Sequence, residues 1–189
     1  YGDHRDLHSF PTDALPISNK QAIQNEMHLP KKTGIPLFSV IGRLDRQKGL
    51  DIIIDSFDRM EETEWQLIVL AFGNDENLRK GLQALQTKYP ERVRFKEEMN
   101  LALSRRLYSS ADMLLMPSRY EPCGLAQMIA MHYGCIPIAT ATGGLKDTIQ
   151  DYSVDISTAT GFLSAAPDVD LFTDQVKLAI TVFKEHSVW

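Results

Sequence analysis

Short apolar runs alternate with longer amphipathic stretches from residue 36 to the end of the chain. The apolar runs are bounded by turn residues, and continuous runs of this kind are typical of strands buried on both faces of a parallel sheet. They cover residues 36–42, 66–72, 92–96, 112–117 and 135–140. Between them, apolar residues at helical spacing predict helices over 49–61, 76–89, 101–111 and 124–134. The alternation predicts an α/β fold with a Rossmann-like, doubly wound parallel sheet.

The two ends of the chain fit this alternation less well. Residues 19–30 predict a helix that is capped by Ser18 or Asn19 and stopped by Pro30, and residues 168–189 predict a helix that runs to the last residue. The first 18 residues show no periodicity, so we interpret them as a linker or as a stretch not native to the domain. We therefore expect three parts: residues 1–18, a helix and linker over 19–35, and one domain over 36–189 that is truncated at its end.

Composition excludes several classes of protein. The 189 residues are 43% hydrophobic and 24% charged, which is ordinary for a globular domain. A net charge of −5 without a Lys/Arg run argues against a nucleic-acid partner, and no apolar run is long enough to cross a bilayer.

Cys123 and Cys135 are too few for a disulfide framework, and the five histidines lack metal-ligand spacing. Asp168-Val169-Asp170 has the form of a D-x-D metal motif, but it precedes a helix and is better interpreted as a cap.

Ligands of a doubly wound sheet bind outside the carboxyl ends of its strands, so the loops there are the candidate site. Arg43 and Lys48 follow the first strand, beside the start of a helix, and this combination suits a diphosphate. A basic loop that is merely solvated is the alternative. The second strand ends in Gly73-Asn74-Asp75, where Asp75 is more readily a helix cap than a ligand contact.

The fourth strand leads into the stretch PSRYEPCGLAQ. Glu121 is well placed to cap the following helix and Pro122 suits its first turn, but a cap does not explain the Pro-Cys-Gly that follows the acid. Gly124 lets a ligand approach the backbone closely. The fifth strand ends in Gly143-Gly144, which opens a helix whose N–H groups can bind phosphate. Loops of this kind at several ends of one sheet converge on a nucleotide-sugar pocket.

Taken together, these pieces resemble one protein family. GRLDRQKGLD, YSSADMLLMPSRYEPCGLAQM, YGCIPIATATGGLKDTI and TGFLS are similar to the C-terminal domain of bacterial glycogen synthases and plant starch synthases. The resemblance covers about residues 19–189, and S-R-[FY]-E-P-C-G-L is its most specific string. It implies a GT-B architecture and a retaining transfer of glucose from ADP-glucose to the 4-OH at the non-reducing end of an α-1,4-glucan. It implies neither a metal nor a cofactor besides the donor.

The resemblance also assigns roles to residues. Arg43 and Lys48 resemble the pair that holds the donor diphosphate and stabilises the leaving group in place of a metal ion. Glu121 resembles the glutamate that hydrogen-bonds the donor glucose, and these three residues are the catalytic candidates. The other candidates, all for binding the donor, are Gly42, Asp75, Met99, Ser118, Cys123, Gly124, Leu125, Thr142, Gly143 and Gly144.

Three places depart from the family pattern. Ile129 stands where the wider superfamily often has a second glutamate, although glycogen synthases often lack it as well. Met99 stands where some relatives have a tyrosine near the adenine. The loop that commonly reads G-x-G-D is Phe72-Gly73-Asn74-Asp75 here.

Two classes of function stay open. The first is the donor-binding half of a glucosyltransferase, which we expect to be inactive alone because the family's N-terminal domain is not in this sequence; a GT-B transferase for another nucleotide sugar is its variant. The second is a non-catalytic nucleotide- or glucan-binding module. The expected partners are ADP-glucose or ADP and, through the missing domain, the glucan, with no nucleic acid and no membrane. The expected location is the cytoplasm of a bacterium or the plastid of a plant or alga.

Overall fold

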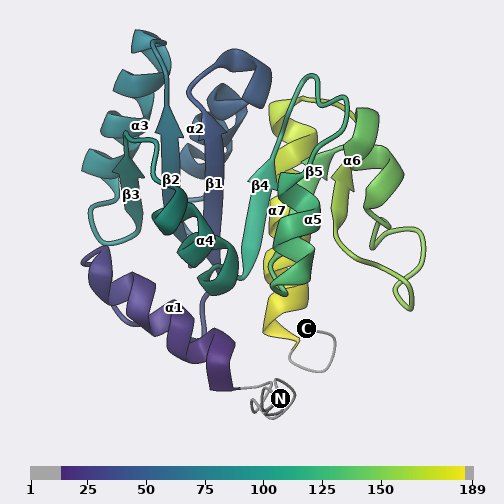
Figure 1. The fold of residues 1–189 in the computed structure, drawn as a ribbon, viewed down its shortest axis with the longest axis horizontal. Coiled ribbons are helices and arrows are strands. Elements are labelled where there is room, and N and C mark those ends of the chain that lie inside the picture. The colour runs from purple at the N-terminus through teal and green to yellow at the C-terminus, as the bar shows by residue number, and fades with distance from the viewer. Residues whose placement is uncertain (1–13, 186–189) are drawn as a thin grey trace, which may run out of the picture.

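The computed structural model describes residues 14–185, and within them six parallel strands form one sheet of order β3-β2-β1-β4-β5-β6. All strand arrows point upward in Figure 1. The fold class predicted from the alternating pattern is confirmed, because each of the five predicted strands is present within one residue of its expected bounds at either end. The strands are β1 Leu37–Arg43, β2 Gln66–Phe72, β3 Val93–Lys96, β4 Met113–Met116, β5 Ile136–Thr140 and β6 Phe162–Ser164.

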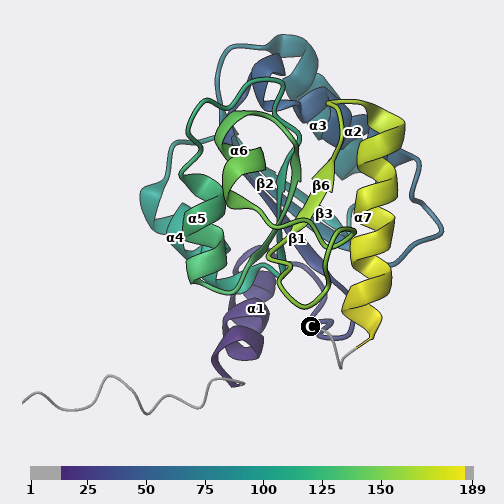
Figure 2. The same cartoon turned by 90° about the vertical axis from the view of Figure 1, so that its right-hand side faces the viewer.

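Helices cover both faces of the sheet. In Figure 2, α2, α3 and α7 lie on one side of the strands and α4, α5 and α6 on the other, with α1 below them on the side of α4. This is the doubly wound arrangement, in which the central strands β1, β2 and β4 are buried between two helical layers. The helices are α1 Ala14–Glu26, the 3-10 turn η1 Arg46–Lys48, α2 Leu50–Asp58, α3 Glu76–Lys88, α4 Leu101–Ser110, α5 Ala126–His132, α6 Gly143–Thr148 and α7 Val169–Lys184.

The ends of the chain differ from the sequence prediction. Helix α1 begins five residues earlier than Asn19 and ends at Glu26, so Pro30 does not stop it. The stop comes at His28, whose backbone is left-handed with φ 53°, and the N–H of Leu29 turns back to the carbonyl of Gln24. Strand β6 was noted only as part of a motif, because three residues carry too little pattern to predict a strand. Helix α7 ends at Lys184, with Glu185 as its C-cap outside the helical conformation, so it does not continue to the last residue as predicted. The interpretation of residues 1–13 and 186–189 lies outside the described part of the chain, and the division into domains stays a prediction.

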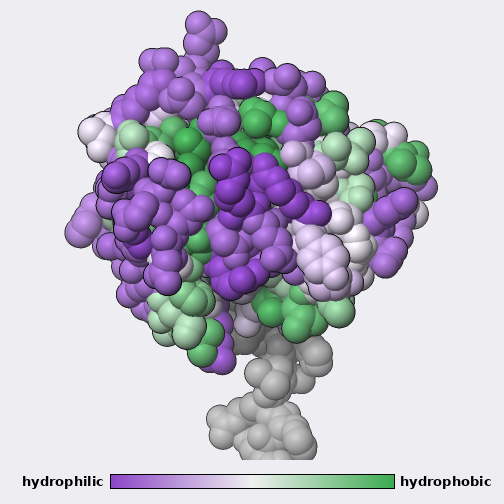
Figure 3. Space-filling view, turned by 90° about the horizontal axis from the view of Figure 1, so that it is seen from above, coloured by the Kyte–Doolittle hydropathy of each residue, from purple (hydrophilic) through white to green (hydrophobic). Residues whose placement is uncertain are grey.

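The order of the strands places a crevice at the centre of the sheet. β1 lies between β2 and β4, and the helices that follow β1 and β4, α2 and α5, lie on opposite faces. Ligands of doubly wound sheets bind at such a switch point, outside the carboxyl ends of the strands. Figure 3 shows this edge of the molecule from above: it is largely hydrophilic, with separate hydrophobic patches. The candidate site therefore lies between the loops that leave β1 and β4.

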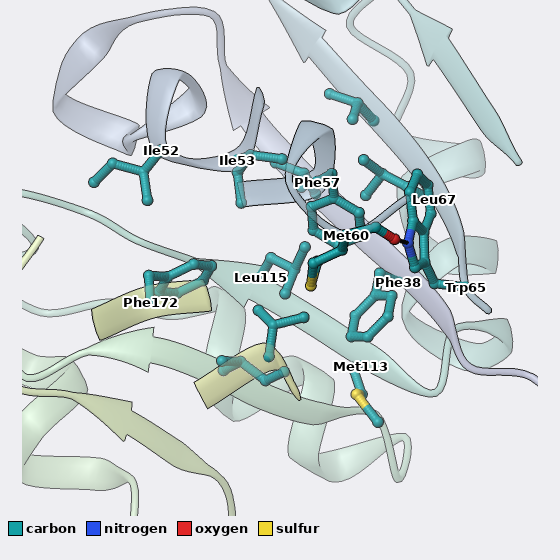
Figure 4. Packing of buried hydrophobic residues seen from close by; sticks show 14 of the residues in the cluster. Phe38, Ile52, Ile53, Phe57, Met60, Trp65, Leu67, Met113, Leu115 and Phe172 are labelled. Atoms are coloured by element: carbon teal, nitrogen blue, oxygen red, sulfur yellow. Dashed lines mark hydrogen bonds between the residues drawn. The ribbon is translucent and has the colours of Figure 1, made fainter. Parts of the chain in front are cut away.

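The larger hydrophobic core lies between the sheet and the layer of α2, α3 and α7. The ring of Phe57 meets Phe38 and Trp65 edge to face, with centroids 5.4 and 4.8 Å apart (Figure 4). The indole N–H of Trp65 donates to the carbonyl of Met60 at 2.8 Å, so its polar atom is satisfied inside the core. Burial of each such ring contributes about 1.5–3 kcal/mol, and this packing fixes α2, and with it the loop between β1 and α2.

A buried ion pair attaches α1 to the amino ends of the strands, on the side of the sheet away from the candidate site. The ammonium of Lys20 lies 2.5 Å from Asp112 Oδ2 and also donates to the carbonyl of Ile35 at 2.7 Å. The same carboxylate oxygen accepts the N–H of Leu37 at 2.7 Å. Burial raises the pKa of Asp112 although Lys20 acts in the other direction. The pair joins α1 to the amino ends of β1 and β4. Among the described residues, no helix is long and apolar enough to span a membrane.

Candidate functional site

Lys48 and Glu121 meet at the carboxyl edge of the sheet, although 73 positions separate them in the sequence. The ammonium of Lys48 lies 2.5 Å from Glu121 Oε2, and the hydroxyl of Ser118 donates to the same oxygen at 3.1 Å. The two charged side chains are 26% and 13% exposed, so the pair is partly shielded from water. Lys48 comes from the loop after β1 and Glu121 from the loop after β4. Three of the predicted site residues thus share one hydrogen-bonded cluster.

The structure contradicts the interpretation of Glu121 as a helix cap. Helix α5 begins at Ala126, and its N-cap is Leu125, whose side chain makes no capping hydrogen bond. The carboxylate of Glu121 is instead held by Lys48 and Ser118. Pro122 lies in the loop before the helix, so its expected place in the first helical turn was also wrong.

Arg43 is the last residue of β1 and remains largely exposed. Its side chain is 55% exposed, with Nη1 3.0 Å from Asp45 Oδ2 and Nη2 3.3 Å from Gln47 Oε1. Asp45 also accepts the N–H of Lys48 at 3.0 Å, as the cap of η1. Arg43 at the end of β1 and Lys48 at the end of η1 therefore lie on either side of one short turn, but Arg43 lies more in solvent than Lys48.

Glycines let the loops of this edge pack backbone to backbone. Gly49 is left-handed with φ 72°, and a Cβ there would overlap the carbonyl of Pro117. A Cβ on Gly143 would overlap the carbonyl of Glu121, and one on Gly144 would overlap that of Cys123. The N–H of Gly144 donates to the carbonyl of Glu121 at 3.0 Å. This N–H is therefore already satisfied, and the Gly-Gly pair has less to offer a phosphate than the sequence predicted.

Arg119 is a residue of this edge that sequence reasoning did not select. Its guanidinium donates to both carboxylate oxygens of Asp51, each at 2.8 Å, and to the carbonyl of Arg46 at 2.6 Å. Burial alone would raise the pKa of Asp51, but the hydrogen bonds and charge of Arg119, with Arg46, outweigh it and lower that pKa. The bond to Asp51 raises the pKa of Arg119. An Asp in the first turn of α2 was visible in the sequence, but its pairing with Arg119 depends on β1 and β4 being neighbours.

Gln127 was also missed. Its amide is fully buried and donates to the carbonyl of Gly124 at 2.8 Å and to the hydroxyl of Thr148 at 2.9 Å. Gly124 is left-handed with φ 64°, and a Cβ there would meet the Gln127 amide. Gln127 therefore ties the start of α5 to the end of α6, and the requirement for glycine at position 124 is explained by this contact.

Two predicted caps are confirmed. Asp75 Oδ1 accepts the N–H groups of Asn77 and Leu78 at the start of α3, at 3.0 and 3.1 Å. Asp168 caps α7 in the same way, so the D-x-D stretch has a structural explanation. Among residues 14–185, no group of three His, Cys, Asp or Glu side chains is arranged to hold a metal ion. The expectation about metal stays a prediction.

The remaining candidates lie around the same edge. A shallow pocket of about 90 Å³ opens between the ends of β1 and β2 and the start of α4, and Gly42 and Met99 line it together with Leu70 and Phe72. Met99 is 70% exposed, so its side chain is free to cover a flat ligand. The other candidates, at the start of α5 and α6, are the exposed Cys123 and Leu125 and the half-buried Thr142. A pocket of about 200 Å³ that includes Ile136 and Phe162 lies at the amino ends of β5 and β6, away from this site.

Comparison with known proteins agrees with the geometry. The sequence profile described as "Glycosyl transferases group 1" matches residues 22–186. The chain belongs to the group 1 glycosyl transferases. Among relatives in this family, a glycogen synthase of Clostridium perfringens is 39% identical over 175 residues, which cover 92% of this chain and 36% of the relative. A glycogen synthase of Lacticaseibacillus casei is 38% identical over 169 residues, covering 89% and 35%.

Solved structures place the chain in the same family. The catalytic domain of starch synthase IV from Arabidopsis thaliana, bound to ADP and acarbose, superimposes with a TM-score of 0.81 at 31% identity. The match covers 90% of this chain and 36% of that one. The fold is thus the Rossmann-like domain of GT-B glycosyl transferases, as predicted. The chain spans about a third of the length of the relatives that it matches.

Proposed function

We propose that the chain is the donor-binding domain of a glucan synthase that transfers glucose from ADP-glucose to an α-1,4-glucan. The contact between Lys48 and Glu121 carries this proposal. In a sugar nucleotide the terminal phosphate is bonded directly to the sugar, so a cation for the phosphate and a carboxylate for the sugar hydroxyls must lie side by side. The loops after β1 and β4 bring such a pair together at the crevice where ligands of this fold bind.

The diphosphate is assigned to Arg43 and Lys48. Arg43 is the last residue of β1, and Lys48 ends the 3-10 turn η1 that follows it. When the bond between the glucose and the terminal phosphate breaks, negative charge grows on the leaving ADP, and fixed cations stabilise that charge. The proposal therefore includes no metal and no further cofactor, since these two side chains supply the positive charge that the step requires.

The glucose is assigned to Glu121. Ionised carboxylates accept hydrogen bonds from hydroxyl groups, and the contacts of this one with Lys48 and Ser118 hold it in one orientation. A sugar that is held by directed hydrogen bonds presents its anomeric carbon to the acceptor in a fixed geometry, which is the main source of rate in a transfer of this kind. Cys123, Leu125 and the Gly-Gly loop lie around the same place and complete the donor side of the pocket.

The adenine is assigned to the shallow pocket beside Met99. The pocket is lined by Ile41, Leu70 and Phe72 as well, and it lies at the ends of β1 and β2, next to the loop that carries Arg43. A flat apolar wall suits a purine ring, and the flexible thioether of Met99 adapts to its face. The starch synthase IV structure, which carries ADP and acarbose, supports nucleotide and glucan as the ligands.

Calorimetric titration of the purified chain with ADP and AMP tests the proposal. We expect ADP to bind more tightly than AMP, because only ADP presents two phosphates to Arg43 and Lys48. Arg43→Ala should weaken ADP binding by about 1.5–3 kcal/mol, or about ten- to 150-fold. The difference in affinity between ADP and AMP should become smaller in this variant. Arg106→Ala is the matched control, because Arg106 pairs with Glu26 by two hydrogen bonds on the distant face of α4. Equal ADP affinity for wild type and Arg43→Ala would refute the proposal.

Two further measurements separate the alternatives. Tighter binding of UDP than of ADP would assign the domain to a transferase of another nucleotide sugar. The second measurement concerns the acceptor: we expect that the chain alone does not transfer glucose from labelled ADP-glucose to glycogen. The described residues supply only the donor side, and transfer requires both substrates in one closed site. Incorporation of label by the purified chain would show that no other domain is needed.

A further inference from the structure

The segments that carry Lys48 and Glu121 are joined by a set of contacts outside the ion pair. The N–H of Arg119 donates to the carbonyl of Gln47 at 2.8 Å, and the side chain of Gln47 donates to the carbonyl of Tyr120 at 3.0 Å. The guanidinium of Arg119 adds its two bonds to Asp51 and one to the carbonyl of Arg46. Arg119 thus contacts the residues on both sides of Lys48, while it lies two positions before Glu121.

The contacts of Arg119 are directional, and they hold both a side chain, the carboxylate of Asp51, and the backbone of the loop after β1. A guanidinium that meets both oxygens of a carboxylate is fixed in plane and distance, which a single ammonium does not achieve. Asp51 belongs to α2, which the core holds in place. The paired hydrogen bonds from Arg119 to Asp51 therefore attach the loop after β4 to a rigid helix. The third bond, to the carbonyl of Arg46, fixes η1, and η1 ends at Lys48.

We propose that Arg119 is a positioning residue of the donor site: with Asp51 it clamps the loop after β1 to the loop after β4 and holds the ammonium of Lys48 where the donor diphosphate binds. The inference rests on the proposed function, in which Lys48 binds that diphosphate. Arg119 itself touches neither phosphate nor sugar in this assignment, because the side chain is engaged with Asp51 and the 3-10 turn. Its effect on the donor passes through Lys48.

A double-mutant cycle in the purified chain distinguishes this role from general structural support. ADP affinity is measured by calorimetry for wild type, Arg119→Ala, Lys48→Ala and the double variant, with the folded fraction of each checked by circular dichroism. We expect Arg119→Ala to weaken ADP binding about tenfold in the wild-type background and by less than about twofold once Lys48 is absent, since residues that act through one another are not additive. Arg106→Ala, which removes a fork of the same kind far from the site, should leave ADP affinity unchanged.

Two companion variants keep the test decisive. If Arg119→Ala does not fold, the cycle is run with Asp51→Asn, which weakens the fork but keeps the bond from Arg119 to the carbonyl of Arg46. Arg119→Lys should recover only part of the affinity, because an ammonium cannot make both bonds to the carboxylate. Equal losses on removing Arg119 with and without Lys48, or no loss at all, would overturn the inference. Unchanged ADP affinity in Lys48→Ala would instead overturn the proposed function, so the two failures are distinguishable.

Discussion

The ammonium of Lys48 lies 2.5 Å from the carboxylate of Glu121, so two of the three charged groups assigned to the donor are each other's partner. In a bound sugar nucleotide, the phosphate contacts the ammonium of Lys48 and the sugar hydroxyls contact the carboxylate of Glu121, while the two side chains also contact each other. The ion pair therefore fixes the relative position of the two groups, and it also competes with the phosphate for Lys48. A change at Glu121 should therefore affect ADP binding and glucose transfer differently.

Glu121→Gln should separate binding from transfer. The amide keeps the shape of the side chain but releases Lys48, so ADP affinity should be unchanged or tighter. In a protein that carries this domain together with an acceptor domain, transfer should fall about a hundredfold, equivalent to about 2.7 kcal/mol of barrier. Calorimetry, melting temperature and transfer rate measured side by side check this. A large fall in melting temperature with an intact rate per folded molecule would make Glu121 a structural residue instead.

Asp51 should make stability depend on pH in the acid range. Its pKa in the folded protein lies below the ordinary value of 3.8. The stabilisation that the ionised carboxylate of Asp51 provides is therefore fully present above that ordinary value, and it is lost as the pH falls through the lower folded-state pKa. Urea unfolding of wild type and Asp51→Asn should show a difference in free energy at about pH 6 that shrinks towards about pH 2. A difference that stays constant over this range would mean that the carboxylate is not held by Arg119 in solution.

Removal of the buried ammonium at position 20 should be costly. Lys20→Met leaves the carboxylate of Asp112 buried without its cation, and breaking such a pair costs about 3–5 kcal/mol. Replacing both partners, Lys20→Met with Asp112→Leu, should restore much of the stability, because no buried charge remains. Lys177→Met, at an exposed position on α7, is the control and should change little. Urea unfolding measures all three, and a loss below about 1 kcal/mol in the first variant would contradict the prediction.

Three glycine-to-alanine variants should separate crowding from backbone strain. Gly144→Ala places a Cβ against the carbonyl of Cys123 and should cost about 3 kcal/mol, the upper part of the usual range for overpacking. Gly134 is left-handed with φ 77° but has open space around it, so Gly134→Ala should cost about 1–2 kcal/mol. Gly34 has neither restriction, and Gly34→Ala should be neutral or slightly stabilising. Thermal unfolding in which Gly144→Ala costs no more than Gly134→Ala would show that the loop after β5 adjusts more than the structure indicates.

The sequence predicted elements well where the pattern is local. Strands such as β2 are apolar from their second residue on and bounded by turns, so their place depends on few other residues. Helix α1 was placed too late because its first residues have no apolar periodicity, and it is held by distant parts of the chain: Ile23 and Met27 pack with residues of α4, and Lys20 pairs with Asp112. Strand β6 was missed because its pairing with β5 defines it more than its own three residues do.

For the site, the sequence placed the candidate residues at one edge of the sheet but not in contact with one another. Lys48 and Glu121 were selected separately, and their contact follows from β1 and β4 being neighbours, which periodicity does not reveal. Arg119 was passed over for the same reason, because its partner Asp51 lies across that junction. The cap interpretation of Glu121 failed because it assumed a helix start at the acid, whereas the loop continues to Leu125.

The strand order also determines when each edge of β1 becomes paired while the chain is synthesised. β1 pairs with β2 along its whole length and can do so early, but its other edge is covered only when β4 arrives, after α3, β3 and α4 have been made. Chains emerge at about 5–20 residues per second, so the unpaired edge of β1 is exposed for seconds. Such an edge is a template for pairing with another chain. We therefore expect this protein to be most prone to aggregation on the ribosome, before β4 is complete, and to gain most from a chaperone that covers the edge at Phe38 and Ser39 during that interval.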